Sequence, residues 1–437
     1  RENLSMERSA GASEPFTGVW YCCGTANVLP GHAHVYSGPM ATYCMWHRPM
    51  AVHCQEVGKT FFVYGNAANE PAVSFYDHER DRFARPVVLG RNPDGDAHRN
   101  PTLLVDAEGF LYVFFGAHSD PTTVVRSAEP YSIADWAPRA TIDDPRTSYP
   151  QPWELRPGEI FVSYRHTPPG WCFRRSRDGA ASWAPRRTLI EFEGCAIYAV
   201  SVAATGDWPR AVHIAWSRLG GGTDEEKRTK HPWALRHHVY YAWSDDGGET
   251  WRRRDGSTYA LPIREETAEK IHDCGERGVW LKDLQLDPGG EPCILFIDAE
   301  VATYRSEWKF ARWSDGRWGV HDVAVSDHMY DAGGLVILDE QDYRIYAPTT
   351  PSQPREDGGE IDEWRSADRG RTWTRTARIT SGSTYSHNQV RVVHNHRAGA
   401  GDFRVLWSYG DSDSPPADRT VHLYRYGEAL PDPVRMT

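Results

Sequence analysis

The chain has 437 residues, which is enough for two or three average domains or for one large repeat fold. With 18 Trp, 21 Tyr, 38 Gly and 30 Pro, it suits short strands joined by many turns. The net charge of −11 argues against a nucleic-acid partner, and no apolar run reaches the length of a membrane span. An anionic ligand would therefore need a local cluster of basic side chains.

A pair of apolar strands joined by a turn, usually with Gly, recurs seven times along the chain. The copies cover residues 48–65, 99–118, 148–166, 198–218, 281–299, 331–350 and 388–409. Their starts are evenly spaced, except for one longer step that holds the polar stretch 220–232, which we interpret as an inserted loop. This pattern predicts an all-β, seven-bladed β-propeller as one domain of residues 1–437, with six or eight blades as the alternatives. Residues 1–20 are expected to form an N-terminal extension or to close a blade.

Three stretches between these copies share the pattern S-x-D-x-G-x-T-W. Residues 244–251 and 366–373 match every fixed position, and residues 176–183 are a looser copy. The Asp carboxylate can accept hydrogen bonds from amides of the turn, Gly can adopt positive φ, and Trp can pack beneath it. We therefore expect these turns at the outer hairpins of three blades.

Residues that flank the seven hairpins should gather on one face of the propeller, because a hairpin brings its two ends together. His98 enters the second hairpin and His118 leaves it, so the two imidazoles should be neighbours. The same rule brings a basic and aromatic set to that face: His47, Tyr149, Gln151, Tyr164, Arg165, Lys282, Tyr330, His387 and Arg391. Such a ring suits an anionic ligand rich in oxygen, such as a uronic acid. For any single member, a structural role at a blade rim is the alternative.

The three turns are Asp-boxes, and the chain resembles the BNR-repeat β-propellers. Residues 96–101, followed by His118, and the segments 149–153 and 164–165 resemble one branch of these proteins. That branch holds ulvan lyases, L-rhamnose-α-1,4-D-glucuronate lyases and α-L-rhamnosidases that act on rhamnosyl-glucuronate ends of arabinogalactan and gum arabic. Sialidases differ, because their early Arg-Ile-Pro motif is absent here.

For a lyase, the resemblance implies catalysis by His98 and His118, with Tyr164 and Arg165 nearby. One imidazole would take the C5 proton of a uronate, Tyr164 would protonate O4, and Arg165 would neutralise the carboxylate. Arg174 or Arg175 is the alternative to Arg165. The expected substrate-binding residues are Asn100, Tyr149, Gln151, Lys282, Tyr330, His387 and Arg391. For a hydrolase, the resemblance implies His47, in a site on the opposite face.

The leading interpretation is an enzyme that eliminates at a rhamnose-α-1,4-glucuronate linkage, with a uronic-acid glycan as its partner. The alternatives are an α-L-rhamnosidase, an ulvan lyase and a non-catalytic glycan-binding propeller. The chemistry requires no cofactor. A structural calcium or zinc is the alternative, with His272 and Cys274 as candidate ligands and His237 and His238 as further ones. Secretion or a periplasmic location is expected by analogy, and Cys22–Cys23 or Cys44–Cys54 could form disulfides.

Overall fold

The structure is a computed structural model. It describes residues 27–28, 35–37, 40–66, 68–168, 170–204, 211–220, 236–350, 357–397, 399, 401–410, 422–427 and 429–436. Residues 1–20 and, apart from Gly220, the expected loop 220–232 therefore lie outside the described residues. None of the described helices is long and apolar enough to cross a membrane.

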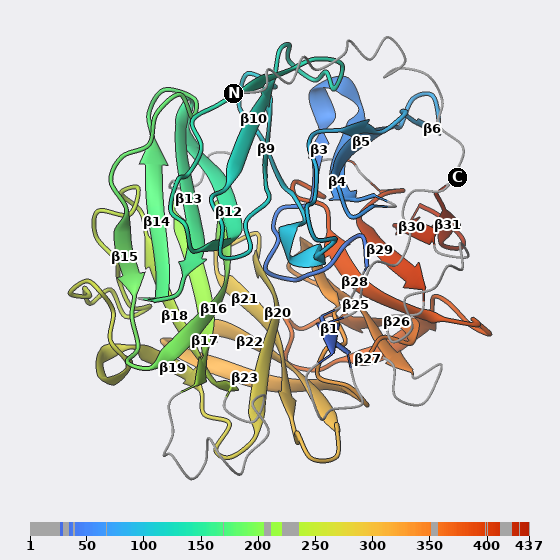
Figure 1. The fold of residues 1–437 in the computed structure, drawn as a ribbon. Helices are drawn as coiled ribbons and strands as arrows, with labels where there is room; N and C mark the ends of the chain where they lie inside the picture. Colours follow the sequence, from blue (N-terminus) through green and yellow to red (C-terminus); the bar gives the residue numbers. More distant parts are fainter. Residues whose placement is uncertain are drawn as a thin grey trace.

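Seven antiparallel sheets follow one another along the described chain and are arranged in a ring, as predicted (Figure 1). The first three blades are β3 (Ala51–Cys54), β4 (Lys59–Gly65), β5 (Pro71–Asp77) and β6 (Arg82–Phe83), with β7 (Val87–Val88) also paired to β5; β8 (Thr102–Val105), β9 (Leu111–Phe115), β10 (Thr123–Ser127) and β11 (Trp136–Pro138); and β12 (Thr147–Arg156), β13 (Glu159–His166), β14 (Gly170–Ser176) and β15 (Arg187–Ile190).

The remaining four blades repeat the same order of strands. They are β16 (Cys195–Ala203), β17 (Val212–Gly220), β18 (Arg236–Ser244) and β19 (Glu269–His272); β20 (Gly278–Leu286), β21 (Pro292–Ala299), β22 (Ser306–Ser314) and β23 (Arg317–Ser326); β24 (Gly334–Asp339), β25 (Asp342–Thr350), β26 (Glu360–Ser366) and β27 (Thr374–Arg378); and β28 (Ser386–Val392), β29 (Val405–Gly410), β30 (His422–Tyr426) and β31 (Val434–Arg435). A separate pair joins β1 (Asn27–Val28) to β2 (Val35–Ser37). The described helices are the short 3₁₀ turns η1 (Gln55–Val57), η2 (Ala97–Arg99) and η4 (Glu265–Thr267).

The seven predicted hairpins are the first two strands of the seven blades. The first strands of successive blades contact one another, which places them on the inside of the ring. The ring closes between the first and last blades, where the His53 amide donates to the His394 carbonyl at 2.9 Å and the His394 amide donates to Ala51 at 2.8 Å. The residues that begin these inner strands therefore share one face of the propeller, and those that end them share the other.

The three Asp-boxes lie between the third and fourth strands of their blades, as expected. In the box of the fourth blade, the Asp246 carboxylate accepts a hydrogen bond from the Thr250 amide at 2.9 Å, and Gly248 has a φ of 85°. Trp251 is fully buried against the rings of Phe161 and Phe173 in the preceding blade. Each box thus ties its turn to the neighbouring blade.

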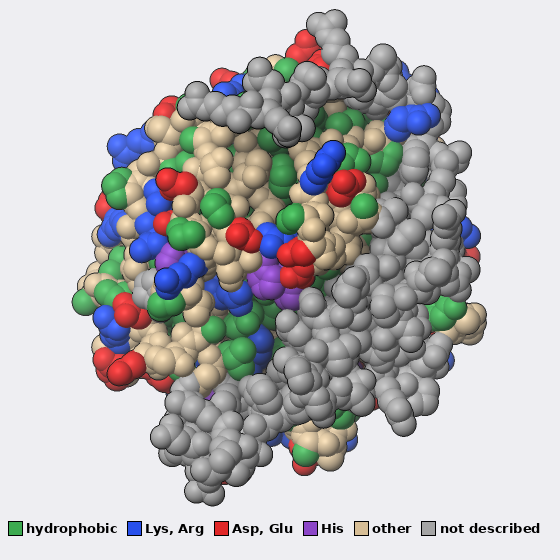
Figure 2. Space-filling view, in the orientation of Figure 1, with side chains coloured by type: hydrophobic (Ala, Val, Ile, Leu, Met, Phe, Trp, Pro, Cys, Tyr) green, Lys and Arg blue, Asp and Glu red, His purple; other side chains and the backbone are tan. Residues whose placement is uncertain are grey.

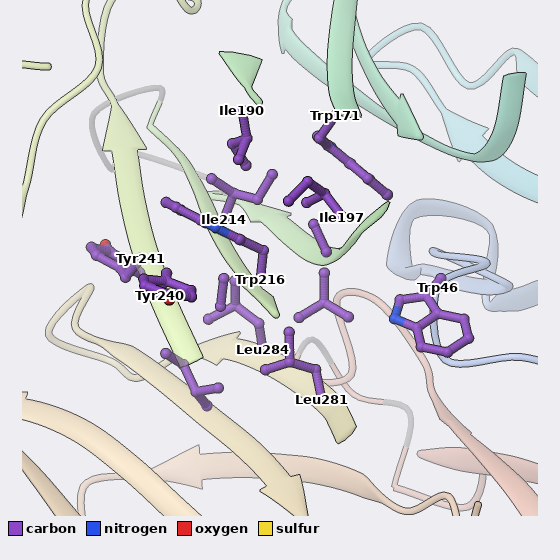
Figure 3. Close-up of a cluster of buried hydrophobic side chains, with 14 of the residues drawn as sticks. Trp46, Trp171, Ile190, Ile197, Ile214, Trp216, Tyr240, Tyr241, Leu281 and Leu284 are labelled. Carbon is purple, nitrogen blue, oxygen red and sulfur yellow. The ribbon is translucent and has the colours of Figure 1, made fainter. Parts of the chain in front are cut away.

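Large apolar side chains fill the spaces between blades, because each sheet carries alternating residues on two buried faces. Figure 3 shows one such cluster, in which Trp171, Ile197, Ile214 and Trp216 pack together and Trp46 lies at the margin, away from Tyr240 and Tyr241. The cysteines within the described residues are buried free thiols, so the suggested Cys44–Cys54 disulfide is wrong. Cys22 and Cys23 lie outside the described residues.

Candidate active site

Three side chains form a compact cluster where the second blade begins its inner strand. The His98 and His118 rings are stacked, with centroids 4.1 Å apart and planes 12° from parallel, which confirms that they are neighbours. The Asp96 carboxylate binds both: Oδ1 lies 2.6 Å from Nδ1 of His98, and Oδ2 lies 2.5 Å from Nδ1 of His118. Asp96 also caps η2 by accepting the His98 amide at 3.0 Å, so one carboxylate fixes the local backbone and both rings.

Asp96 determines which nitrogen of each imidazole carries the proton. A carboxylate only accepts hydrogen bonds, so both Nδ1 atoms donate and both Nε2 atoms are left as the basic positions. The Nε2 atom of His98 meets the Tyr43 hydroxyl at 3.1 Å. The His118 side chain is 27% exposed, whereas that of His98 is 4% exposed. His118 is therefore the member of the pair that a substrate can reach.

The electrostatics of the cluster keep Asp96 charged and His98 neutral. Burial by itself would raise the pKa of Asp96, but the hydrogen bonds from His118 and His98 outweigh it and hold that pKa far below its usual range. Burial lowers the pKa of His98 to about 4, although Asp96 opposes the shift. Figure 2 shows His side chains near the centre of this face, bordered by acidic and basic groups.

Arg165 lies beside the imidazole pair, across the ring of Tyr149. The Tyr149 ring is 6.0 Å from the His98 ring, and Cζ of Arg165 is 4.7 Å from the Tyr149 centroid. The guanidinium also lies 5.0 Å from the ring of Tyr198 and donates to the Ser148 hydroxyl at 3.3 Å. These contacts place a cation and two aromatic rings at the rim next to the histidines, which suits recognition of a carboxylate.

Tyr164 lies on the other face of β13 from Arg165, because successive side chains of a strand alternate. Its hydroxyl donates to the Asp144 carboxylate at 2.5 Å, and Nε of Arg174 lies 3.3 Å from the hydroxyl oxygen. Arg186 also pairs with Asp144, at 3.1 Å. Burial, then Asp144, raises the pKa of Tyr164 well above its usual value. Tyr164 and Arg174 are thus neighbours, whereas Arg175 turns away to pair with Glu249.

Two of the expected substrate-binding amides are instead committed to the protein. Gln151 is fully buried; its Nε2 donates to the Trp46 and Ala199 carbonyls, and its Oε1 accepts from Ser201. The Nδ2 group of Asn100 donates to three carbonyls of the turn at residues 40–43. These amide groups join neighbouring segments of the inner wall, and binding of substrate by Gln151 and Asn100 stays a prediction. A polar side chain at the start of a hairpin can form hydrogen bonds with backbone groups of the protein as readily as with a ligand.

The remaining expected residues lie around the central channel. Lys282 donates to the Met329 carbonyl at 2.7 Å, and Arg391 donates to the Thr42 carbonyl at 2.9 Å. Nδ1 of His387 accepts from the indole of Trp407 at 2.9 Å. The Tyr330 ring is 6.3 Å from the ring of Trp280. These side chains are buried, and Lys282 and Arg391 line a hollow of about 30 Å³ within the channel.

His47 lines the same small hollow and lies against the imidazole cluster. Its Nε2 donates to the His98 carbonyl at 2.9 Å, and its Nδ1 accepts from the Cys44 amide at 3.0 Å. Burial lowers the pKa of His47 to about 3. Trp153 and His394 line both this hollow and a larger pocket of about 800 Å³, which lies at the opposite face, where the inner strands end. The His47 ring therefore binds the backbone of the imidazole cluster and also lines the hollow in the channel.

The two metal-ligand candidates do not share a site. His272 binds Asp298 through Nε2 at 2.6 Å. Cys274 instead lies 3.7 Å from Nδ1 of His237 and 3.8 Å from Nδ1 of His238. Within the described residues, the one group of three or more such side chains whose ligand atoms converge is Asp96, His98 and His118. His272 and Cys274 thus belong to no such group among the described residues, and zinc binding by this pair stays a prediction.

Four residues of this face were not singled out from the sequence. Asp96 lies in the segment that carries the family resemblance, two residues before His98, where a carboxylate could have been expected to orient the ring. Tyr198 begins the fourth hairpin and obeys the same rim rule as Tyr149. Tyr43 and Arg236 offered no such signal, because they lie outside the repeated hairpins.

Comparison with known proteins agrees with this fold. An ulvan lyase of Nonlabens ulvanivorans is 24% identical over 408 residues, which are 81% of this chain and 84% of that protein. The Ulvan Lyase-PL25 of Pseudoalteromonas sp. (strain PLSV) is 24% identical over 366 residues, 74% of this chain and 72% of that protein. A solved PL25 ulvan lyase bound to -[GlcA(1-4)Rha3S]- has the same fold, with a TM-score of 0.76, 19% identity and coverage of 94% and 96%. The model of the BNR repeat-containing family matches residues 59–326, and the chain belongs to that family.

Proposed function

We propose that this protein is a polysaccharide lyase that cleaves a glycan at a rhamnose-α-1,4-glucuronate linkage by β-elimination. The observation that carries the proposal is the stacked pair of imidazoles anchored to one carboxylate, with Arg165 next to it. A carboxylate that binds Nδ1 of an imidazole leaves Nε2 as a positioned base. A glycan-binding propeller without catalysis would have no need of such a pair.

In the proposed reaction, Arg165 neutralises the uronate carboxylate and thereby makes the C5 proton more acidic. Nε2 of His118, the exposed member of the pair, takes that proton. Electrons of the C5–H bond form the C4–C5 double bond, and the C4–O4 bond breaks. Tyr149, whose ring lies beside both His98 and Arg165, supplies the proton to O4, because burial raises its pKa and keeps the hydroxyl protonated at neutral pH. The resulting imidazolium is stabilised by Asp96. Tyr164, the acid expected from the sequence, faces the other side of β13, and its hydroxyl is bound to Asp144.

The relatives support a substrate that contains both uronate and rhamnose. The curated relatives are named as ulvan lyases, and the solved relative binds an oligosaccharide of glucuronate and sulfated rhamnose. An ulvan-type polymer and the rhamnosyl-glucuronate ends of gum arabic are therefore the two substrate forms to distinguish. Because such polymers are extracellular, we propose that the protein acts outside the cytoplasm. The elimination uses side chains alone, and a structural calcium or zinc stays a prediction that metal analysis of the purified protein would test.

An α-L-rhamnosidase that hydrolyses the same linkage through His47 is the second candidate. The pocket of about 800 Å³ on the opposite face favours it, because residues of its wall also line the hollow at His47. Both ring nitrogens of His47 are already hydrogen-bonded within the protein, which disfavours a catalytic role. We therefore rank hydrolysis below elimination.

Incubation with gum arabic and with ulvan, followed by ultraviolet absorbance and by released rhamnose, tests the proposal. We expect an unsaturated-uronate signal that His98→Ala and His118→Ala abolish. His321→Ala is the matched control, since His321 lies on the outer strand β23 of another blade. Released rhamnose without the unsaturated signal would contradict elimination and favour the rhamnosidase. Binding without turnover, retained in both variants, would indicate a lectin.

A further inference from the structure

Arg236 is a buried cation that forms no ion pair with any residue of the described part of the chain. It begins β18 and is 2% exposed. Its Nε and Nη1 atoms are buried and make no hydrogen bond, and none of the ion pairs between described residues includes it. A buried guanidinium in this state costs free energy, because water no longer solvates its N–H groups. An anion that reached these groups would relieve that cost.

Two further hydrogen-bond donors without an acceptor belong to aromatic residues beside Arg236. Its Cζ lies 4.0 Å from the ring of Tyr198, 5.1 Å from Trp46 and 5.6 Å from Trp280. The indole nitrogens of Trp46 and Trp280 are also buried without an acceptor. In Figure 3, Trp46 stands at the margin of the apolar cluster. Three neighbouring residues thus hold unsatisfied N–H groups, the arrangement that an oxyanion complements.

Tyr198 connects Arg236 to the proposed active site. The Tyr198 ring contacts both guanidinium groups: Cζ of Arg236 is 4.0 Å and Cζ of Arg165 is 5.0 Å from its centroid. Burial by itself would raise the pKa of Tyr198, but Arg165 and Arg236 outweigh it and lower that pKa. The side chain is only half-buried, so it reaches the surface of the rim. A line of contacts therefore runs from His98 through Tyr149, Arg165 and Tyr198 to Arg236.

We propose that Arg236, with Tyr198 and the indoles of Trp46 and Trp280, forms a second subsite that binds an oxyanion of the glycan. The ligand is a carboxylate or a sulfate ester on a sugar beside the one held by Arg165, and in this respect the inference rests on the proposed function. Arg236 presents a planar set of donors that matches either group. The subsite contributes to binding and leaves the proton transfers to the histidines.

The test is calorimetric binding of four small probes to the protein and to Arg236→Met. The probes are methyl glucuronide, rhamnose 3-sulfate and their neutral counterparts, methyl glucoside and rhamnose. Met keeps much of the volume of Arg236 but removes its charge and donors. Arg252→Met is the matched control, because Arg252 follows the other end of β18 and pairs with Asp245. We expect the Kd of one acidic probe to rise by about ten- to a hundredfold in Arg236→Met and to be unchanged in the control.

The probe that depends on Arg236 identifies the oxyanion as a carboxylate or a sulfate ester. The melting temperature supplies an independent readout: it should stay the same or rise in Arg236→Met, because a buried unsatisfied cation is removed. Equal affinity of Arg236→Met and the wild type for both acidic probes would overturn the subsite. So would a lowered melting temperature with unchanged affinity, which would mark Arg236 as purely structural. Binding needs no turnover, so failure of the lyase assay with Arg236-dependent binding would refute the proposed function alone.

Discussion

Replacing Asp96 with Asn should show whether catalysis depends on which ring nitrogen of the imidazoles carries the proton, because both His98 and His118 remain in this variant. Oδ1 of Asp96 accepts both the His98 amide and Nδ1 of His98, so the Asn carbonyl oxygen should remain there. The Asn NH₂ group then faces Nδ1 of His118, where Oδ2 now accepts at 2.5 Å. Nδ1 of His118 must become the acceptor, which moves the ring proton to Nε2. His118 could then no longer take the C5 proton.

We expect kcat to fall by about 10²- to 10⁴-fold in Asp96→Asn, the range for loss of a correctly positioned general base. KM should not rise, because the change removes a negative charge beside an anionic substrate. Loss of the charge-assisted hydrogen bonds should also lower the free energy of unfolding by about 1.5–3 kcal/mol. The assay is the initial rate of unsaturated-uronate absorbance. Asp94→Asn is the control, since Asp94 is about half-exposed and pairs with Arg99. Wild-type kcat in Asp96→Asn would refute the assignment of His118 as the base.

Three further predictions follow from buried side chains. Trp251→Ala should lower the free energy of unfolding, measured in urea, by about 3–5 kcal/mol, because Trp251 is fully buried. The control is Trp373→Ala, at the half-buried Trp of another Asp-box, and an equal loss of stability in this control would contradict the prediction. Tyr149→Phe should lower kcat about 10²-fold or more with little change in KM, because the proton for O4 is lost. Tyr164→Phe is the control, since the Tyr164 hydroxyl is bound to Asp144 on the other face of β13, and an unchanged kcat in Tyr149→Phe would leave Tyr149 structural. The melting temperature should fall when the pH is lowered below about 6.5, because a His that burial keeps neutral binds its proton only on unfolding. Each such His should lower the free energy of unfolding by up to about 1.4 kcal/mol per pH unit. A melting temperature that stays constant down to about pH 5 would contradict this prediction. The groups whose pKa burial lowers to about 3 or 4 are His47, His98, His213, His394 and His396.

The fold was predictable because repetition is visible in the sequence itself. The seven hairpins and the Asp-box turns rest on local patterns, namely alternating strands and Gly, Asp and Trp at defined positions. The same rule placed His98 beside His118, because both ends of one hairpin must meet. Blade number and the position of the candidate face thus followed from short-range information.

The contacts within that face were less predictable, because they depend on where each side chain points after the blades close into a ring. Gln151 enters a hairpin at the rim, as Tyr149 does, yet its amide binds the Trp46 and Ala199 carbonyls. Tyr164 and Arg165 are adjacent in sequence but face opposite sides of β13. Arg236 lies outside the repeated hairpins and meets Trp46 and Trp280 only through tertiary packing. Spacing in a sequence shows which backbone segments will meet, but it does not show which polar side chains will form hydrogen bonds with the neighbouring segments.

The mass of the product from a defined rhamnosyl-α-1,4-glucuronate oligosaccharide tests the central claim most directly. Elimination expels rhamnose and leaves an unsaturated uronate, which is lighter by one water than the hydrolysis product. We predict the unsaturated product from the wild-type protein and no product from His118→Ala. A saturated glucuronate end, formed equally well by His118→Ala, would contradict elimination at the imidazole pair.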